Sequence, residues 1–312
     1  MGPFGGYDRR KNSPPETMAQ PTTPVRAPPC EADRVPKVTS RTPSVRVEVS
    51  AEGVRVTRRP DTVTVEEPLQ IRLGGRPLSV TMRTPGADFD LVIGFLLTEG
   101  LIGASDDVAT LMHCQDLGED GAPTYNVVDV VLRPDVVVPE MGLERYFAST
   151  SACGVCGKAS IDDVRNRSRY DLRNDRTTLA PHVLMRLPQA LHEQQKVFDR
   201  TGGLHAAGLF TTDGELLAIR EDVGRHNAVD KLIGWAARER LVPLHGCVLM
   251  VSARASFALT QKAMMAGIPC LAAISAPSSL AVQLATESGM TLIGFLRPPR
   301  MSVYAGAERL GL

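Results

Sequence analysis

Cys247-Val248-Leu249-Met250-Val251 is the first of three apolar segments that decide the fold of the C-terminal half of this chain. The other two begin at Pro269 and Thr291, and helical patterns at residues 257–266 and 280–288 lie between them. Buried strands that alternate with helices predict parallel βαβ units with right-handed crossovers. We therefore expect an α/β domain with a partly parallel sheet.

The ends of these strands carry polar residues. In open α/β sheets, ligands bind outside the carboxyl ends of the strands. The residues concerned are Ser252, Arg254 and Ser256 after the first strand, Ser278 and Ser279 after the second, and Arg297 and Arg300 after the third. The first two ends run into helix N-termini, which favour anions. For each serine alone, helix capping is the simpler interpretation, but three such ends at one edge favour a phosphate-bearing ligand.

Upstream of these units, the sequence predicts a β-hairpin flanked by two helices. Apolar residues at 204–210 and 216–221 surround the turn residues Asp213-Gly214. Residues 188–198 and 225–240 have helical patterns, and Pro188 suits a first helical turn.

Two histidine-containing stretches adjoin this hairpin. His205 follows Gly202-Gly203 at the start of a strand, while Glu221-Asp222-Val223-Gly224-Arg225-His226-Asn227 leads into a helix. A lone histidine is usually structural, but a polar cluster beside an apolar strand is more often a site. Asp222, Arg225 and His226 are therefore candidates, because a guanidinium group can bind phosphate or carboxylate bidentately.

The N-terminal part predicts a smaller α+β domain without an obvious catalytic cluster. Valines alternate with polar residues from about Ser44, and alternation on both sides of Gly74-Gly75 predicts a second hairpin. A helix is expected next, capped by Asp88 and ended by Gly100. Residues 125–132 predict a further strand.

Composition limits the class of protein. The chain has 312 residues, with 35 basic and 35 acidic side chains, so no global field draws it to nucleic acid or to a membrane surface. It has no apolar run of membrane-spanning length and no secretory h-region. Only two of its six cysteines are closely spaced, which favours a cytoplasmic protein with reduced thiols. Residues 1–43 are rich in proline and arginine and are expected to be disordered.

Cys153 and Cys156 form a CxxC pair that permits three interpretations. A zinc site needs four ligands, and His113-Cys114 or His205 could supply the others, although no His-x-Glu of a zinc deaminase occurs. A thioredoxin-like pair would follow the first strand of a βαβ unit, which this pair does not. The third interpretation is a sulfur carrier: the CxxC partner and Lys158 lower the thiol pKa, and the thiolate holds sulfur as a persulfide.

Several stretches together resemble the formate dehydrogenase accessory sulfurtransferase family, FdhD. They are Thr150-Ser151-Ala152-Cys153-Gly154-Val155-Cys156-Gly157-Lys158, Thr201-Gly202-Gly203-Leu204-His205-Ala206-Ala207, residues 220–231 (REDVGRHNAVDK) and Gly94-Phe95-Leu96-Leu97-Thr98-Glu99-Gly100. The resemblance spans residues from about 44 to the end. It implies a cytidine-deaminase-like C-terminal domain without deaminase chemistry, and a cytoplasmic homodimer.

The resemblance also implies a task. Such a protein takes sulfur from a cysteine desulfurase and delivers it to the bis-guanine-dinucleotide molybdenum cofactor of formate dehydrogenase, with no permanent cofactor or metal of its own. The persulfide position corresponds to Cys153. The cofactor-binding stretch corresponds to Phe295-Leu296-Arg297-Pro298-Pro299-Arg300, in which Pro299 stands where a small residue is expected.

The predicted organisation has four parts: a disordered segment (1–43), an α+β domain (44–145), a CxxC loop (146–160) and an α/β cofactor-binding domain (161–312). Two other functions remain open from the sequence. One is a zinc-dependent nucleoside or pterin hydrolase of deaminase-like fold, which would contain metal. The other is an assembly scaffold, which would tolerate loss of both thiols.

Overall fold

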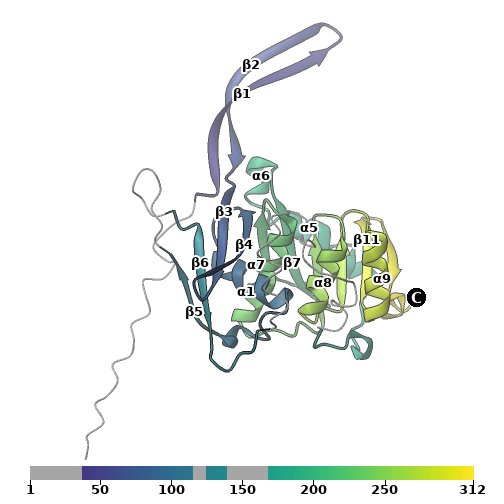
Figure 1. Cartoon of the computed structure of the whole chain (residues 1–312). Coiled ribbons are helices and arrows are strands. Elements are labelled where there is room, and N and C mark those ends of the chain that lie inside the picture. The colour runs from purple at the N-terminus through teal and green to yellow at the C-terminus, as the bar shows by residue number, and fades with distance from the viewer. Residues whose placement is uncertain (1–36, 115–123, 139–167) are drawn as a thin grey trace, which may run out of the picture. The chain divides into compact units, whose positions relative to one another are not determined.

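The computed structural model describes residues 37–114, 124–138 and 168–312. Cys153 and Cys156, with the whole predicted CxxC loop, lie outside these ranges. The described strands form a two-stranded sheet β1-β2, a four-stranded sheet β4-β3-β6-β5 and a six-stranded sheet β12-β11-β10-β9-β7-β8 (Figure 1).

The six-stranded sheet confirms the predicted α/β fold. Its strands are β7 (His205–Thr211), β8 (Leu216–Asp222), β9 (Cys247–Val251), β10 (Cys270–Ala273), β11 (Thr291–Arg297) and β12 (Arg300–Ala305). The three predicted strands β9, β10 and β11 are parallel to one another. The predicted hairpin β7-β8 is antiparallel, and β7 also runs antiparallel to β9.

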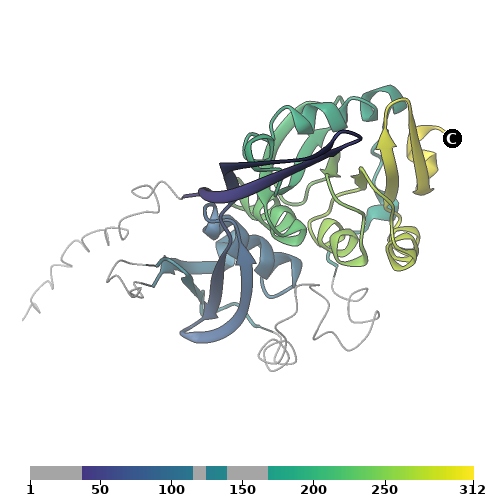
Figure 2. The same ribbon diagram turned by 90° about the horizontal axis from the view of Figure 1, so that it is seen from above.

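Helices cover both faces of this sheet (Figure 2). They are α7 (Arg225–Arg238), α8 (Phe257–Met265) and α9 (Ser279–Ser288) on one face, and α4 (Pro181–Leu184), α5 (Leu187–His192) and α6 (Phe198–Thr201) toward the other. Along β9, Leu249 and Val251 belong to one apolar cluster, whereas Val248 and Met250 belong to the other. A strand buried on both faces reads as a continuous apolar run, which is why β9 could be predicted.

The helix expected over residues 188–198 is shorter than predicted. The carboxylate of Glu221 accepts hydrogen bonds from the backbone N–H groups of Val197 and Phe198, at 3.2 and 2.9 Å. Because these groups are bonded from outside the segment, a separate helix, α6, starts at Phe198, whereas α5 already ends at His192.

The four-stranded sheet consists of β3 (Glu67–Leu73), β4 (Arg76–Arg83), β5 (Val108–His113) and β6 (Val127–Leu132), and α1 (Asp88–Thr98) packs beside it. The predicted turn is confirmed: Gly74 and Gly75 have φ of 56° and 78°, which favour glycine. Asp88, however, does not cap α1. It lies inside the helix, and both of its carboxylate oxygens accept hydrogen bonds from the buried Arg83.

The two predicted domains share one apolar core. Its residues come from β3, β6 and α1 as well as from β7, α7 and α8. The closest packing is between α1 and α7, and the predicted boundary between the domains falls outside the described residues. Within the described residues, three short 3-10 helices accompany these elements: Ser105–Asp107, Leu172–Asn174 and Ala307–Leu310.

The first strand begins before the expected residue Ser44. Strands β1 (Thr39–Ser50) and β2 (Gly53–Thr64) form a long hairpin in which Thr39 pairs with Thr64 (Figure 1). Residues 39–43, assigned above to a disordered segment, are therefore strand, because they pair with residues 60–64. No helix in the described ranges has the length and apolar character needed to cross a bilayer.

Candidate functional site

The carboxyl ends of β9, β10 and β11 meet at one edge of the six-stranded sheet, which we call the strand-end edge. Because β7 runs antiparallel to β9, its first residue lies at the same edge. His205 also pairs with Asp222, the last residue of β8. The predicted strand ends and both histidine-containing stretches therefore lie at this edge.

Three serine hydroxyls at this edge accept hydrogen bonds from backbone N–H groups of the protein itself. Ser252 Oγ accepts a hydrogen bond from the Ala206 N–H at 2.9 Å, joining β9 to β7. Ser256 and Ser278 cap α8 and α9, since their hydroxyl oxygens accept hydrogen bonds from backbone N–H groups three residues later. The capping interpretation is thus confirmed for these two, while Arg254 and Ser279 are exposed.

The stretch Phe295-Leu296-Arg297-Pro298-Pro299-Arg300 lies where β11 turns into β12. Arg297 and Arg300 are paired residues on either side of the two prolines, and all four are exposed. Phe295 is also exposed, with a φ of 51°, and its N–H donates to Ser275 O. Leu296 is fully buried in the core, so it offers no surface to a ligand.

Asp222 joins the edge to the N-terminal sheet. Its carboxylate forms an ion pair with Lys231 at 2.7 Å and accepts a hydrogen bond from the Thr84 N–H at 3.1 Å. It also accepts bonds from the Gly224 N–H and the Asn227 side chain. With its oxygens bonded in this way, a ligand could contact Asp222 only by displacing a protein group.

Arg225 and His226 differ from the rest of this motif. Within the described residues, Arg225 Nε and His226 Nε2 are buried side-chain nitrogens without a hydrogen-bond partner. Both residues begin α7, whose N-cap Gly224 provides no side-chain capping bond. Burial of a polar group without a partner is costly, so these two nitrogens are the best candidates for contact with a ligand.

Burial and two nearby positive charges keep His226 neutral. Burial, then the positive charges of Lys262 and Arg225, lower its pKa from 6.5 to about 4, although Glu99 opposes them. Burial and Arg225 also lower the pKa of His205. At neutral pH, both imidazoles are therefore uncharged hydrogen-bonding groups.

A buried ion cluster lies beneath His226 and was missed in the sequence. Lys262 Nζ of α8 contacts the Asp230 carboxylate of α7 at 2.8 Å and Glu99 at 3.6 Å, and it donates to Thr98 Oγ1. Burial alone would lower the pKa of Lys262, but the two carboxylates raise it. The available signal in the sequence was a lone lysine within an apolar helical pattern. A lysine buried there needs a partner of opposite charge, because burial of an unpaired charge is costly.

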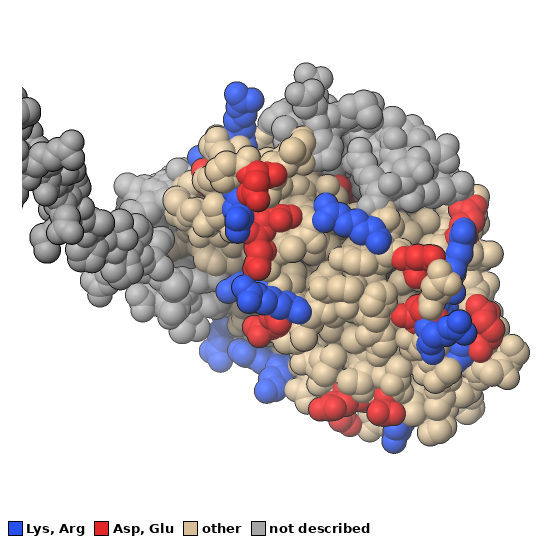
Figure 3. Space-filling model, turned by 90° about the horizontal axis from the view of Figure 1, so that it is seen from below, with Lys and Arg blue, Asp and Glu red and all other residues tan. Residues whose placement is uncertain are grey.

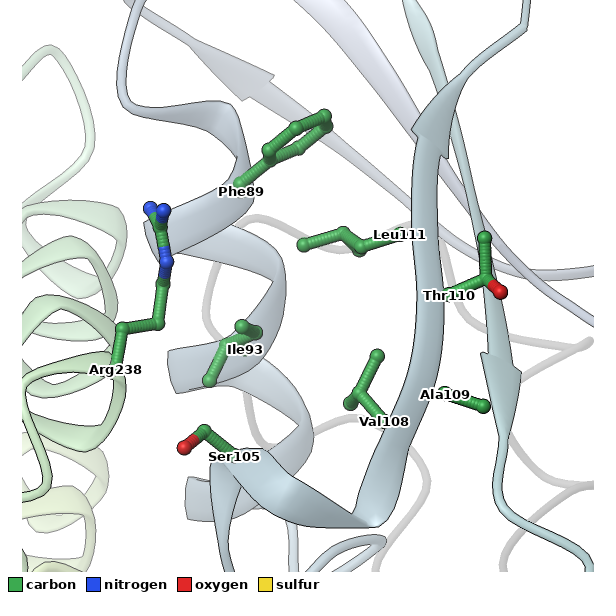
Figure 4. Close-up of a pocket in the computed structure, with 8 residues that line it drawn as sticks. All are labelled: Phe89, Ile93, Ser105, Val108, Ala109, Thr110, Leu111 and Arg238. Carbon is green, nitrogen blue, oxygen red and sulfur yellow. The ribbon is translucent and has the colours of Figure 1, made fainter. Parts of the chain in front are cut away.

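A separate hollow of about 340 Å³ lies between α1 and β5 (Figure 4). Phe89, Ile93, Val108 and Leu111 give it an apolar wall. Two polar groups at its margin are bonded elsewhere: Ser105 Oγ donates to Ala237 O, and Arg238 donates to Asp90. None of the buried side-chain nitrogens or oxygens without a hydrogen-bond partner in the described residues belongs to the lining of this hollow.

The charges on the visible face in Figure 3 are mixed, with acidic and basic side chains interspersed. Among the residues that the structure places, no three His, Cys, Asp or Glu side chains gather as a metal site would require. The CxxC pair falls outside that search, so the zinc interpretation of Cys153 and Cys156 stays a prediction.

Comparisons with known proteins identify the family. The model of the FdhD/NarQ family matches residues 64–311. Proteins named sulfur carrier protein FdhD are 58% identical in Mycolicibacterium paratuberculosis, covering 81% of this chain and 93% of the relative, and 56% identical in Streptomyces avermitilis, covering 88% and 97%. A solved structure, described as a formate dehydrogenase accessory protein from Desulfotalea psychrophila, has a TM-score of 0.65 at 23% identity, covering 86% of this chain and 99% of that one. The chain belongs to the FdhD/NarQ family.

Proposed function

We propose that this protein is a sulfur carrier that serves formate dehydrogenase maturation. It receives sulfur from a cysteine desulfurase as a persulfide on Cys153 and delivers it to the bis-guanine-dinucleotide molybdenum cofactor held at the strand-end edge. The curated relatives reported above are named as sulfur carriers, and they cover most of this chain. The deaminase-like hydrolase gains no support from the residues described.

The first chemical step is thiol–disulfide exchange. The Cys153 thiolate attacks the terminal sulfur of a persulfide on the desulfurase. A new S–S bond forms on Cys153, the donor's S–S bond breaks, and the donor cysteine leaves as a thiolate. No external oxidant or reductant is needed, because the sulfur atom keeps its oxidation state.

The observation that carries the proposal is the content of the strand-end edge. Exposed Arg254, Arg297 and Arg300 follow the ends of β9 and β11, which suits a ligand with several phosphates. Arg225 and His226 add buried nitrogens without protein partners. A guanine dinucleotide offers both kinds of group, charged phosphates and neutral ring edges, so it is the ligand class that this edge fits best.

The remaining assignments follow the family resemblance. The partners would be a cysteine desulfurase and formate dehydrogenase, and the protein would act in the cytoplasm as a homodimer. Nucleic acid and membranes are not expected partners, since acidic and basic residues balance.

Genetic complementation tests the function. In a host that lacks its own sulfur carrier of this family, the wild-type chain should restore formate dehydrogenase activity and Cys153→Ala should not. Cys247→Ala is the matched control, because burial raises the pKa of that thiol and makes it unreactive. Full activity of Cys153→Ala would refute the persulfide role.

A further inference from the structure

The hollow between α1 and β5 has an apolar wall that the described chain leaves open (Figure 4). Val108 and Leu111 of β5 face Ile93 of α1 across it, and the two β5 side chains are only half-buried. Its volume of about 340 Å³ is near the lower end of the range for ligand pockets, roughly 300–1,000 Å³. The hollow therefore suits one or two large side chains better than a dinucleotide.

The margin of the hollow carries a positive charge, because two arginines share one carboxylate there. Arg238 and Arg220 form ion pairs with Asp90 at 2.7 and 3.0 Å. One of the two positive charges is thus left uncompensated, and the Arg238 side chain is 47% exposed. In the neighbouring 3-10 helix, Asp106 is already paired with Arg240. An occupant with an acidic side chain beside its apolar ones is therefore favoured.

The chain lies beside this hollow at both ends of residues 139–167, which are outside the described ranges. Before them, the Arg133 N–H donates to Asp107 O at 2.9 Å. After them, the Arg169 guanidinium lies against Gly103, since a Cβ on that glycine would overlap it. Asp107 ends the 3-10 helix at the margin of the hollow, and Gly103 lies just before that helix. The occupant can therefore come from the intervening stretch of this chain.

We propose that residues 139–147 (PEMGLERYF) dock in this hollow. Leu143 and Phe147 supply the apolar side chains, and Glu144 between them pairs with Arg238. Burial of an aliphatic and an aromatic side chain stabilises the contact, and the carboxylate meets the uncompensated charge at the margin.

Length and composition favour this segment over the others. Phe147 is nine residues beyond Val138, the last described residue before the segment, so the chain can span about 30 Å. Residues 141–147 contain four large apolar side chains, and no other seven consecutive residues outside the described ranges contain as many. Docking also restricts Cys153, which follows Phe147 by six residues and so stays within about 20 Å of the hollow.

Limited trypsin digestion of the full chain tests the proposal, because proteolysis reports the fraction of molecules in which a segment is open. Cleavage after Arg145 should be at least about tenfold slower than after Lys158, which lies in the same stretch but outside the docking segment. Phe147→Ser should remove this protection. Ile161→Ser, which deletes an apolar side chain elsewhere in the stretch, is the matched control and should keep it. The test does not rest on the sulfur-carrier function, because neither cysteine of the CxxC pair is needed for cleavage.

Variants of the hollow show where the segment docks. Leu111→Asp should remove the protection of Arg145, because it places a carboxylate in the apolar wall. Met112→Asp, the next residue of β5 and 38% exposed, is its control and should behave as wild type. Circular dichroism should show the same fold in both variants.

A milder pair of variants tests the charge at the margin and serves even where Leu111→Asp fails to fold. Arg238→Gln should speed cleavage after Arg145 about two- to fivefold, as loss of a partly exposed ion pair does. Arg240→Gln, which removes a neighbouring exposed arginine, should not.

Three results would overturn the proposal. The first is a wild type that is cleaved after Arg145 as fast as after Lys158. The second is protection that Phe147→Ser and Arg238→Gln both leave unchanged. The third is protection that falls when the protein is diluted, since a second copy would then be covering the segment.

Discussion

Gly94 of α1 and Gly234 of α7 face each other at the crossing of these helices. A Cβ on Gly94 would overlap the carbonyl oxygen of Asp230, and one on Gly234 would overlap that of Asp90. This reciprocal contact brings the two backbones together without intervening side chains. It joins the N-terminal α+β part to the helix that begins with Arg225 and His226.

Gly234→Ala should therefore destabilise the protein by about 1–3 kcal/mol, as overpacking does in a closed site. At a helix position with free space around it, a change from glycine to alanine raises the unfolding free energy by up to about 1 kcal/mol. Whether Gly234→Ala lowers or raises stability therefore decides whether the two helices pack closely. Urea unfolding measures it, with Glu239→Ala at the exposed end of α7 as the control. An unchanged or higher midpoint for Gly234→Ala would contradict the close packing.

Lys262→Met should lower the unfolding free energy by about 3–5 kcal/mol, because it leaves the Asp230 and Glu99 carboxylates buried without their cation. Arg240→Met is the control. Its ion pair with Asp106 has side chains 77% and 64% exposed, so its loss should cost less than about 1 kcal/mol. Similar losses in both variants would show that the cluster around Lys262 is not buried as described.

His226 should make stability depend on pH. Its pKa is about 4 in the folded protein and 6.5 when unfolded, so between these values the unfolded chain binds a proton that the folded protein does not. The unfolding free energy therefore falls as pH drops from 7 toward 4. His226→Gln should reduce this pH dependence in urea titrations at pH 7 and 5. A variant with the full wild-type slope would contradict the assignment.

Arg300→Ala should weaken binding of GDP, used as a fragment of the dinucleotide cofactor. Loss of a charge-assisted phosphate contact costs about 1.5–3 kcal/mol, or roughly 10- to 150-fold in affinity. Calorimetric titration measures this, with the exposed Arg133→Ala at the end of β6 as the control. Equal affinity in Arg300→Ala and wild type would remove Arg300 from the site, and a wild type that binds no GDP would remove the site itself.

The fold was predictable where the local pattern of apolar residues in the sequence matches the burial of the segment in the structure. Strands β9, β10 and β11 are buried on both faces, and the helices after β9 and β10 end at glycines. Strands β5 and β12 were missed, since most of their residues are exposed or half-buried. The valines of β1 and β2 predicted strands correctly, but alternation could not reveal that their apolar face lies outside the core.

The site was predictable only in part, for a physical reason. The rule that strand ends of a parallel sheet share one edge brought Ser252, Ser278 and Arg297 together from the sequence. It could not reveal that Leu296 is buried, or that the Asp222 carboxylate bonds Thr84, just after β4, and Lys231 of α7. Such pairings join residues far apart in the chain, so they depend on how helices pack rather than on local patterns.

Intact-mass analysis shows whether Cys153 carries sulfur. The purified protein is incubated with a cysteine desulfurase and cysteine, and its mass is measured before and after reduction. We expect a gain of at least one sulfur atom that reductant removes, and this gain should be retained in Cys247→Ala and lost in Cys153→Ala. A wild type that gains no sulfur, or a Cys153→Ala variant that gains as much as wild type, would contradict it.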